Sequence, residues 1–216
     1  MKTEKIILVG AGYTADEISP IILNNKDNKN YKIVGILDDN KKFYKKNYKG
    51  IPIYIGLENA KKYSDCKFVF GIGSYKNKNQ REKIFKKMQL PKNYFPNMIH
   101  SSAIIENNVK MGFGNIVYAN SSICSDTQIE HFTMLTYSCI VAHKVKIGSF
   151  SLFGSRSSIL NNVNIGKNVF CGANVIFAEN VKIGNMSSII FGSNVLTNVP
   201  SKKTAFGNPA KILNYV

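Results

Sequence analysis

The chain has 216 residues, 44% of them hydrophobic, so it is long and apolar enough to form a buried core. No run approaches the roughly 18 apolar residues of a membrane helix, and the start reads as a strand and not as a signal peptide, so we expect a cytoplasmic location without membrane insertion. The net charge of +16 suits nucleic acid, a membrane surface or a phosphate-bearing ligand, but lysine scattered among asparagine favours a compositional bias, and we expect no nucleic-acid partner.

The first elements alternate between strands and a helix. An apolar strand over residues 6–9 ends at Gly10 and Gly12, and a helix follows over about residues 14–23. A second strand over residues 31–37 ends at the acid pair Asp38-Asp39. Glycines at the end of a strand let the backbone approach an anionic group at a helix N-terminus, and a carboxylate after the second strand suits a ribose or a base.

A third strand, over residues 67–72, leads into Gly73, and a basic helix follows over residues 79–88. This order predicts a Rossmann-like α/β domain over residues 1–95. The segment is too short for a full six-stranded dinucleotide domain together with a hydride-transfer site. We therefore expect a truncated sheet that holds a mononucleotide, and an NAD dehydrogenase is a distant alternative.

From Ile99 onward the sequence repeats every six residues. All of the sixth positions are apolar: Ile99, Ile105, Met111, Val117, Ile123, Ile129, Leu135, Val141, Ile147, Phe153, Ile159, Ile165, Cys171, Phe177, Ile183, Ile189 and Val195. The residue four places after each anchor is often small or β-branched, as at Ser121, Thr127 and Val145. Because a helix would need apolar spacings of three and four, the repeat predicts short strands with inward-facing anchors.

A longer period of eighteen residues lies over the six-residue repeat, seen at Ile147-Gly148, Ile165-Gly166 and Ile183-Gly184. Three repeats then make one coil. We expect each coil to be a triangle of three short strands, with successive coils stacked about 4.8 Å apart. Residues 96–216 are therefore predicted to form a parallel β-helix.

Hexapeptides of the form aliphatic-Gly-x-x-small are typical of the left-handed β-helix acyltransferases, which the sequence resembles over residues 99–216. The closing segment Gly207-Asn208-Pro209-Ala210-Lys211 is similar to the end of family members that bind CoA, although a simple cap on the last coil explains it as well. The left hand comes from this resemblance, since general connection rules favour the opposite hand. The resemblance implies acetyl-CoA as co-substrate and no metal.

The order of the two domains resembles the nucleotide-amino-sugar N-acetyltransferases and the related sialic-acid O-acetyltransferases. In that family the first glycine turn and the acid pair after the second strand hold the sugar nucleotide. The resemblance implies a substrate site at Gly12, Tyr13, Thr14, Asp38 and Asp39, with Ile72 and Gly73 as neighbours. The family commonly has Gly-His in place of Tyr13-Thr14, which leaves the nucleotide and the sugar open. It also implies a homotrimer with sites between subunits.

Acyl transfer to an amine or a hydroxyl needs a general base, and histidine suits this role near neutral pH. Of the three histidines, His143 lies in a segment that resembles the catalytic stretch of the family, so we assign it as the base. His131 is the reserve, and His100 is expected to be structural. In the family a glutamate follows the base, but here Lys144 does, and a neighbouring cation lowers a histidine pKa.

The coil period offers a substitute for the missing acid. Asp126 precedes Lys144 by one coil and should stack beneath it, so we hypothesise that Asp126 neutralises Lys144; an ordinary surface ion pair is the alternative. Asn161 should stack above His143. By position matching to the family, acetyl-CoA should run along the coils near the following residues: Gly154, Ser155, Gly172, Ala173, Phe191 and Gly192.

The sequence favours an acetyl-CoA-dependent N-acetyltransferase that acts directly on a nucleotide-linked amino sugar. O-acetylation of a sialic acid or of another capsular or lipopolysaccharide sugar is the nearest alternative. A catalytically degenerate binding scaffold is a further one, because of Lys144. A γ-carbonic-anhydrase-like zinc enzyme is disfavoured, since the histidines form no close pair and the cysteines Cys66, Cys124, Cys139 and Cys171 show no ligand spacing.

Overall fold

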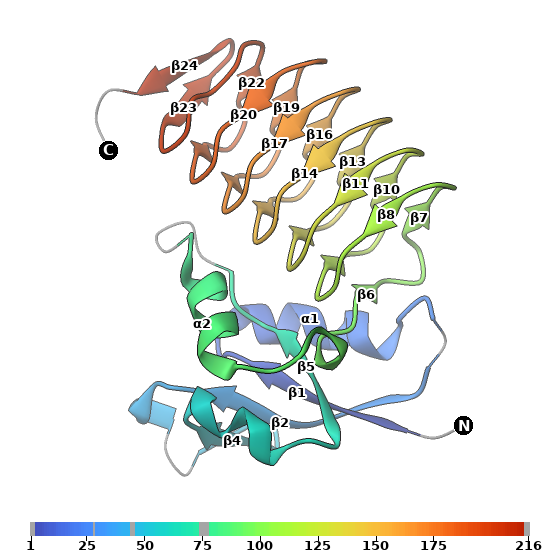
Figure 1. Ribbon diagram of the computed structural model, residues 1–216, viewed down its shortest axis with the longest axis vertical. Helices are drawn as coiled ribbons and strands as arrows, with labels where there is room; N and C mark the ends of the chain where they lie inside the picture. The colour runs from blue at the N-terminus through green and yellow to red at the C-terminus, as the bar shows by residue number, and fades with distance from the viewer. Residues whose placement is uncertain (1–2, 28, 44–45, 74–77, 214–216) are drawn as a thin grey trace.

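The computed structural model describes residues 3–27, 29–43, 46–73 and 78–213. An α/β domain forms one end of the molecule, and a column of stacked coils extends from it (Figure 1). The coils form the left-handed parallel β-helix that the six-residue repeat and the resemblance predicted. In the described ranges, no helix has the length and apolar character needed to cross a bilayer.

The N-terminal sheet has five strands in the order β3-β4-β2-β1-β5, and β1 pairs in parallel with both β2 and β5. The predicted strands and helices are confirmed, except that the third strand ends at Phe70 and so leaves Ile72 in the following loop. The sequence reading missed the short strands β3 and β4. The elements are β1 (Glu4–Val9), α1 (Tyr13–Leu23), β2 (Tyr31–Asp38), β3 (Asn47–Tyr48), β4 (Ile51–Ile55), β5 (Cys66–Phe70) and α2 (Gln80–Met88), with 3-10 helices at Lys41–Phe43, Leu57–Lys62 and Lys92–Tyr94.

The β-helix has three faces, each a parallel sheet with one strand per coil. The domain-facing sheet holds β6 (Met98–Ile99), β9 (Ile116–Val117), β12 (Met134–Leu135), β15 (Leu152–Phe153), β18 (Phe170–Cys171), β21 (Ser188–Ile189) and β23 (Thr204–Gly207), with β24 (Ala210–Leu213) antiparallel at its end. We call the second face the apolar sheet: β7 (Ile104–Ile105), β10 (Ser122–Ile123), β13 (Ile140–Val141), β16 (Ser158–Ile159), β19 (Ile176–Phe177) and β22 (Asn194–Val195). We call the third the lysine sheet: β8 (Lys110–Met111), β11 (Gln128–Ile129), β14 (Lys146–Ile147), β17 (Asn164–Ile165) and β20 (Lys182–Ile183).

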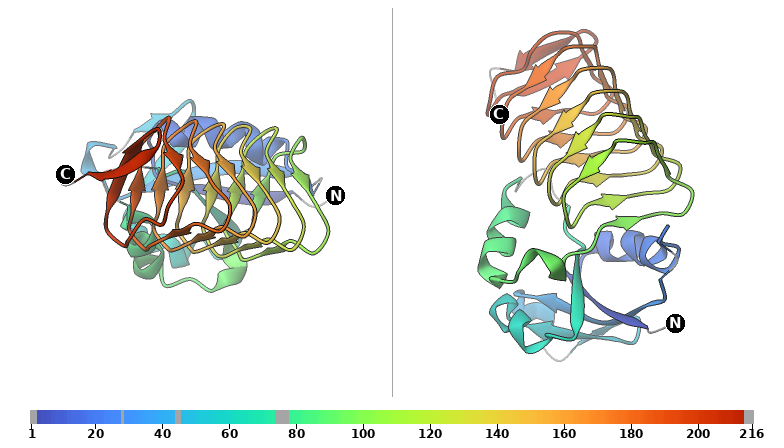
Figure 2. Two further views of the ribbon diagram at one scale, coloured as in Figure 1. Left: turned by 90° about the horizontal axis from the view of Figure 1, so that it is seen from above. Right: turned by 45° about the vertical axis from the view of Figure 1, so that its right-hand side comes forward.

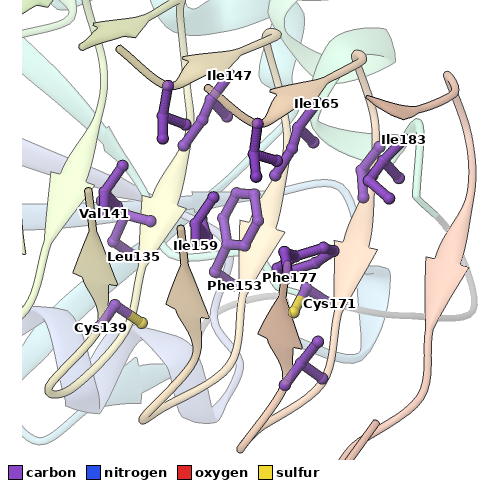
Figure 3. Close-up of a cluster of buried hydrophobic side chains, with 14 of the residues drawn as sticks. Leu135, Cys139, Val141, Ile147, Phe153, Ile159, Ile165, Cys171, Phe177 and Ile183 are labelled. Carbon is purple, nitrogen blue, oxygen red and sulfur yellow. The ribbon is translucent and has the colours of Figure 1, made fainter. Parts of the chain in front are cut away.

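The anchors of the repeat fill the interior of this prism, as predicted. From Val117 to Val195 they belong to one buried cluster, and part of it is drawn in Figure 3. The small or β-branched residues four places after the anchors are buried at the corners. Their hydroxyls are satisfied by backbone carbonyls one coil away, as where Thr127 donates to the Ala142 carbonyl at 2.8 Å. The repeat therefore determines both the apolar core and the hydrogen bonds of the hydroxyls buried at its corners.

From Asn108 to Gly192, each corner of the triangle turns through a residue with a left-handed backbone. Asp126, Lys144 and Asn162 have φ values of 62°, 59° and 60°, three places after their anchors. Asparagine tolerates this conformation better than most residues, which explains the many asparagines at this position. The corners direct the preceding side chains away from the prism, where His143 lies.

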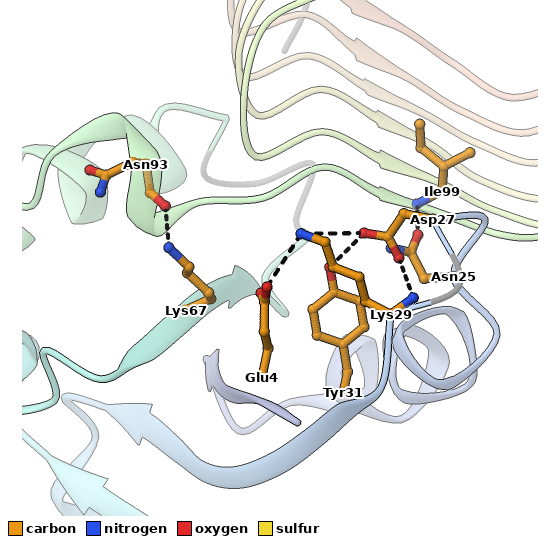
Figure 4. A network of polar contacts seen from close by, with 8 residues as sticks. All are labelled: Glu4, Asn25, Asp27, Lys29, Tyr31, Lys67, Asn93 and Ile99. Carbon is orange, nitrogen blue, oxygen red and sulfur yellow. Dashed lines mark hydrogen bonds and ion pairs between the residues drawn. The ribbon is translucent and has the colours of Figure 1, made fainter. Parts of the chain in front are cut away.

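The two domains are joined along α1 and α2. At the end of α1, Asn25 accepts a hydrogen bond from the Ile99 amide at 2.7 Å, beside a polar network centred on Asp27 (Figure 4). Figure 2 shows α2 beside the column of coils. From α2, the buried guanidinium of Arg81 donates to the carbonyls of Phe132 and Phe150, at 3.0 and 2.5 Å, and burial lowers its pKa to about 10.

Candidate active site

The N-terminal domain holds a cavity of about 510 Å³ at the carboxyl ends of its central strands. It lies where β1 passes into α1, beside the ends of β2 and β5. All seven predicted substrate residues line it together: Gly12, Tyr13, Thr14, Asp38, Asp39, Ile72 and Gly73. This is the edge of an open α/β sheet at which ligands bind, next to the N-terminus of a helix.

The acid pair builds part of the cavity wall. Asp38 accepts hydrogen bonds from the amides of Ala11 and Asn40, both at 2.8 Å, and so fixes the glycine turn. Asp39 accepts from the Leu57 amide at 2.7 Å and pairs with Lys87 at 2.5 Å. These contacts give both carboxylates a structural role beside the ligand role that the sequence suggested. Tyr13 is 92% exposed at the cavity and is available to a ligand.

His143 lies on the corner that joins the apolar sheet to the lysine sheet, just after β13. Its Nδ1 is 3.0 Å from the Ser125 Oγ, one coil earlier. The predicted stacking of Asn161 is confirmed, because Asn161 Oδ1 accepts from the His143 amide at 3.1 Å. When Nδ1 donates its proton to Ser125, Nε2 carries the lone pair that a base needs. The imidazole is exposed and contacts Ser125 of the preceding coil, while Asn161 of the following coil holds the backbone of His143.

Glu106 is the carboxylate beside this histidine, and the sequence reading missed it. Its Oε2 accepts from the Ser125 amide at 2.8 Å. Ligand atoms of Glu106 and His143 lie within 4.8 Å of one another. The signal was present in the coil period, since Ser125 is eighteen residues before His143 and Glu106 reaches it from one coil earlier still.

Among the residues that the structure describes, no ion pair supports the hypothesis that Asp126 neutralises Lys144. The two residues lie at the same corner of successive coils, as expected, and the Lys144 amide donates to the Ser125 carbonyl at 3.2 Å. In the described part of the chain, however, no ion pair joins their side chains. Glu106 is the carboxylate whose oxygen lies within 4.8 Å of an imidazole nitrogen.

Cys124 lies next to this group but is a poor nucleophile. Burial raises the pKa of its thiol, and the charge of Glu106 and a hydrogen bond to it raise the pKa further. A protonated thiol attacks a thioester slowly. The raised pKa therefore makes Cys124 a weak nucleophile near neutral pH.

The other two histidines have local partners. His100 Nδ1 lies 2.8 Å from Ser102 Oγ, at the junction of the domains. The ring of His131 stacks on Phe113 with a centroid separation of 4.1 Å, and its Nδ1 accepts from the Phe113 amide at 3.3 Å. These contacts agree with structural roles for both residues.

The six residues predicted to bind CoA lie along a different corner from His143. Gly154, Ser155, Gly172, Ala173, Phe191 and Gly192 follow strands of the domain-facing sheet, so they line its junction with the apolar sheet. Two of these glycines are required by stacking alone. A Cβ at Gly154 would lie 2.4 Å from the Ala173 nitrogen, and one at Gly172 would lie 2.5 Å from the Phe191 nitrogen. Within one chain, the apolar sheet separates these residues from His143.

The apolar sheet is exposed, unlike the domain-facing sheet. Ile104, Ile140 and Ile176 point outward from alternate coils and are 59%, 48% and 42% exposed. On the domain-facing sheet, Ile116 and Met134 are buried against the N-terminal domain. Serine or asparagine takes the outward position in the coils between them. Exposed aliphatic side chains gathered on one face are typical of a protein interface.

Comparisons with known proteins agree with this architecture. Residues 5–88 match the family described as the PglD N-terminal domain. A histidine-to-asparagine mutant of perosamine N-acetyltransferase from Caulobacter crescentus, in complex with CoA and GDP-perosamine, aligns with a TM-score of 0.83 at 22% identity, over 97% of each chain. No curated protein sequence matches the chain.

Two further structures share the whole fold. The acetyltransferase domain of PglB from Neisseria gonorrhoeae, in complex with acetyl coenzyme A, aligns with a TM-score of 0.85 at 18% identity, over 98% of this chain and 100% of that one. WeeI from Acinetobacter baumannii aligns with a TM-score of 0.75 at 18% identity over the same shares. Residues 5–88 thus match the PglD N-terminal domain family, and the chain as a whole has the fold of the hexapeptide-repeat sugar acetyltransferases.

Proposed function

We propose that the protein is an acetyl-CoA-dependent N-acetyltransferase that acts on the amino group of a nucleotide-linked amino sugar. The observation that carries the proposal is the exposed imidazole of His143, held at Nδ1 by Ser125, in a fold that also contains a sugar-nucleotide-sized cavity. The similar structures from Caulobacter and Neisseria were solved with CoA and GDP-perosamine and with acetyl coenzyme A, which supports the same two ligand classes here.

In the proposed reaction, the sugar amine attacks the thioester carbonyl carbon while His143 Nε2 takes the proton from the nitrogen. The tetrahedral intermediate then collapses, the C–S bond breaks, and the imidazolium returns the proton to the CoA thiolate. Glu106 stabilises the imidazolium by charge, and Ser125 fixes its orientation. Backbone amides of the coil stabilise the oxyanion. The products are an N-acetyl sugar nucleotide and CoA.

The site is completed by a second subunit. The cavity faces the domain-facing sheet, since a Cβ at Gly73 would lie 3.0 Å from Leu152 of β15. His143 occupies the corner of the triangle opposite that sheet, between β13 and β14. The prism therefore stands between the base and the cavity of the same chain, and a transfer site needs His143 from one chain and a cavity from another.

A homotrimer joined through the apolar sheets satisfies this requirement. In a closed ring, the His143 edge of one apolar sheet meets the opposite edge of its neighbour. That opposite edge carries Gly154, Gly172 and Phe191, the residues predicted to bind CoA. Packing of Ile104, Ile140 and Ile176 at the interface would remove their exposed surface from water. We expect the trimer to act in the cytoplasm.

Subunit mixing tests the site directly. His143→Asn removes the base, and Gly12→Leu fills the cavity at a position where a Cβ meets no atom within 4 Å. Each variant alone should lose acetyl transfer by at least about 100-fold. Randomly mixed trimers should recover about a quarter of the wild-type rate, because each site then needs one intact base and one intact cavity from different chains.

His131→Asn is the matched control and should keep its activity, since His131 is held by Phe113 away from the proposed site. Full activity of His143→Asn would overturn the assignment of the base. Absence of recovery in mixed trimers of folded, inactive variants would place base and cavity in one chain, contrary to the proposal.

The acceptor that is acetylated distinguishes the proposed N-acetyltransferase from its nearest alternative, an O-acetyltransferase. O-acetylation of a sialic acid or another capsular sugar would use the same base on a hydroxyl. Mass spectrometry of acetyl-CoA incubated with UDP-, GDP- and TDP-amino sugars, and in parallel with sialic acids, distinguishes the two. Lys144 beside His143 favours a binding scaffold as a second candidate. Calorimetric binding of acetyl-CoA without turnover on any acceptor would support the scaffold.

A further inference from the structure

Three metal-binding side chains converge at the His143 corner. Ligand atoms of Glu106, Cys124 and His143 all lie within 4.8 Å of one another. They come from three successive coils, just after β7, β10 and β13. In the described ranges, this is the one group of three or more such side chains found so close together.

The donor set selects a kind of metal. A thiolate sulfur, an imidazole nitrogen and a carboxylate oxygen are the ligands of zinc and similar transition-metal ions, whereas calcium and magnesium prefer oxygen alone. Cys124 is also the one cysteine of the four that is partly exposed, because Cys66, Cys139 and Cys171 are buried. The single thiol that a metal ion can reach therefore lies beside a histidine and a carboxylate.

The coils hold the three donors close to a binding geometry. Zinc bonds of about 2.0 to 2.3 Å place neighbouring donors roughly 3.5 Å apart in a tetrahedron, so small side-chain rotations would close the present group. Glu106 and His143 are exposed, and each would exchange its one hydrogen bond with Ser125 for a bond to the ion, while the stacked strands fix their backbones. Three protein ligands would leave a fourth position for water.

We propose that Glu106, Cys124 and His143 bind a zinc-like divalent ion, and that the bound ion switches off the base. The metal site goes beyond the proposed function and does not depend on it. The inhibitory effect of the bound ion, in contrast, rests on the proposed function. A metal at Nε2 would occupy the lone pair that accepts the substrate proton. A metal at Nδ1 would leave Nε2 protonated. Either mode removes the imidazole from proton transfer.

Calorimetric titration of the full, untagged protein with zinc tests the site. We expect one ion per chain, and an affinity at least about tenfold lower in Cys124→Ser and in Glu106→Gln. Glu130→Gln is the matched control, because Glu130 accepts from the Ser149 amide at 3.0 Å as Glu106 does from Ser125, but it belongs to no such group. Glu130→Gln should bind zinc as the wild type does.

Cobalt(II) reports the ligands by absorption. A sulfur-to-cobalt charge-transfer band should form in the wild type and vanish in Cys124→Ser. Absence of stoichiometric zinc binding, or binding that Cys124→Ser leaves unchanged, would overturn the site.

The inhibitory step has a separate readout. Zinc should lower the acetyl-transfer rate of the wild type, a chelator should restore it, and Cys124→Ser should resist zinc relative to its own metal-free rate. Zinc binding without inhibition would overturn the switch and leave the site. Binding in a protein that acetylates no acceptor would support the site while rejecting the proposed function.

Discussion

The β-helix and the N-terminal domain place functional side chains by different means. Around His143, the partners Ser125 and Asn161 each lie one coil away, at the same register. Around the cavity, the partners come from unrelated segments, as where Lys87 of α2 pairs with Asp39. Every ion pair in the described part of the chain joins residues of the N-terminal domain. Repetition fixes neighbours in one region, and individual loops fix them in the other.

Removal of a buried aromatic side chain from the prism should have the largest effect on the free energy of unfolding. It also tests the difference between the two regions. Phe177→Ala leaves a void among the stacked anchors and should cost about 3 to 5 kcal/mol. Because each coil contacts mainly the next coils, hydrogen exchange should increase in the coils around β19 and stay slow in β1 and β2.

Phe191→Ala is the matched control. Phe191 is 68% exposed, so its removal should change the free energy of unfolding by about 0.5 kcal/mol or less. Equal loss of protection in β1 and in β19 for Phe177→Ala would show that the two regions unfold as a single unit.

The same difference explains what the sequence could predict. The anchors from Val117 to Val195 identify the prism, and the coil period also placed Asn161 beside His143 correctly. The same coil period could have placed Glu106 near His143. It was missed because the Glu106 side chain reaches forward to Ser125 in the next coil. The coil period could not predict whether Asp126 and Lys144 would pair, because it fixes the backbone at the same corner of adjacent coils but not the rotamers of exposed side chains.

In the N-terminal domain, the family resemblance grouped the seven residues, and they line one cavity where a glycine turn and strand ends meet at one edge of the sheet. The sequence analysis missed β3, a two-residue strand at the sheet edge, and β4, which lies between β3 and β2. It also missed that the carboxylates of Asp38 and Asp39 are already engaged by Ala11 and Leu57. Such contacts depend on loop paths that have no period.

The next largest effect is expected at the contact between the N-terminal domain and the β-helix. Arg81→Ala removes two charged hydrogen bonds and leaves the carbonyls of Phe132 and Phe150 without this donor. We expect a loss of about 2 to 3 kcal/mol in denaturant unfolding, because buried polar groups without partners are costly. Lys86→Ala on the exposed side of α2 should cost about 0.5 kcal/mol or less. A loss of that small size for Arg81→Ala would show that packing alone joins the domains.

The smallest effect concerns an exposed cluster of the N-terminal domain. Asp16 accepts hydrogen bonds from Lys49, at 2.7 Å, and from Tyr48. The bond from Lys49, followed by that from Tyr48, lowers the pKa of the Asp16 carboxyl. A lowered carboxyl pKa stabilises the fold above the ordinary value near 4, and this contribution disappears as the pH falls through the lowered value.

A double-mutant cycle of Asp16→Asn and Lys49→Met should therefore show a small favourable coupling at about pH 7 and a weaker one at about pH 2. Denaturant unfolding at both pH values measures it. The pairing is exposed, so added salt should also weaken it, unlike the core effect of Phe177→Ala. Coupling that is undiminished at low pH would mean that Asp16 and Lys49 interact through packing and not through charge. The neighbours of Asp16 would then contribute to stability through packing, as the side chains inside the prism do.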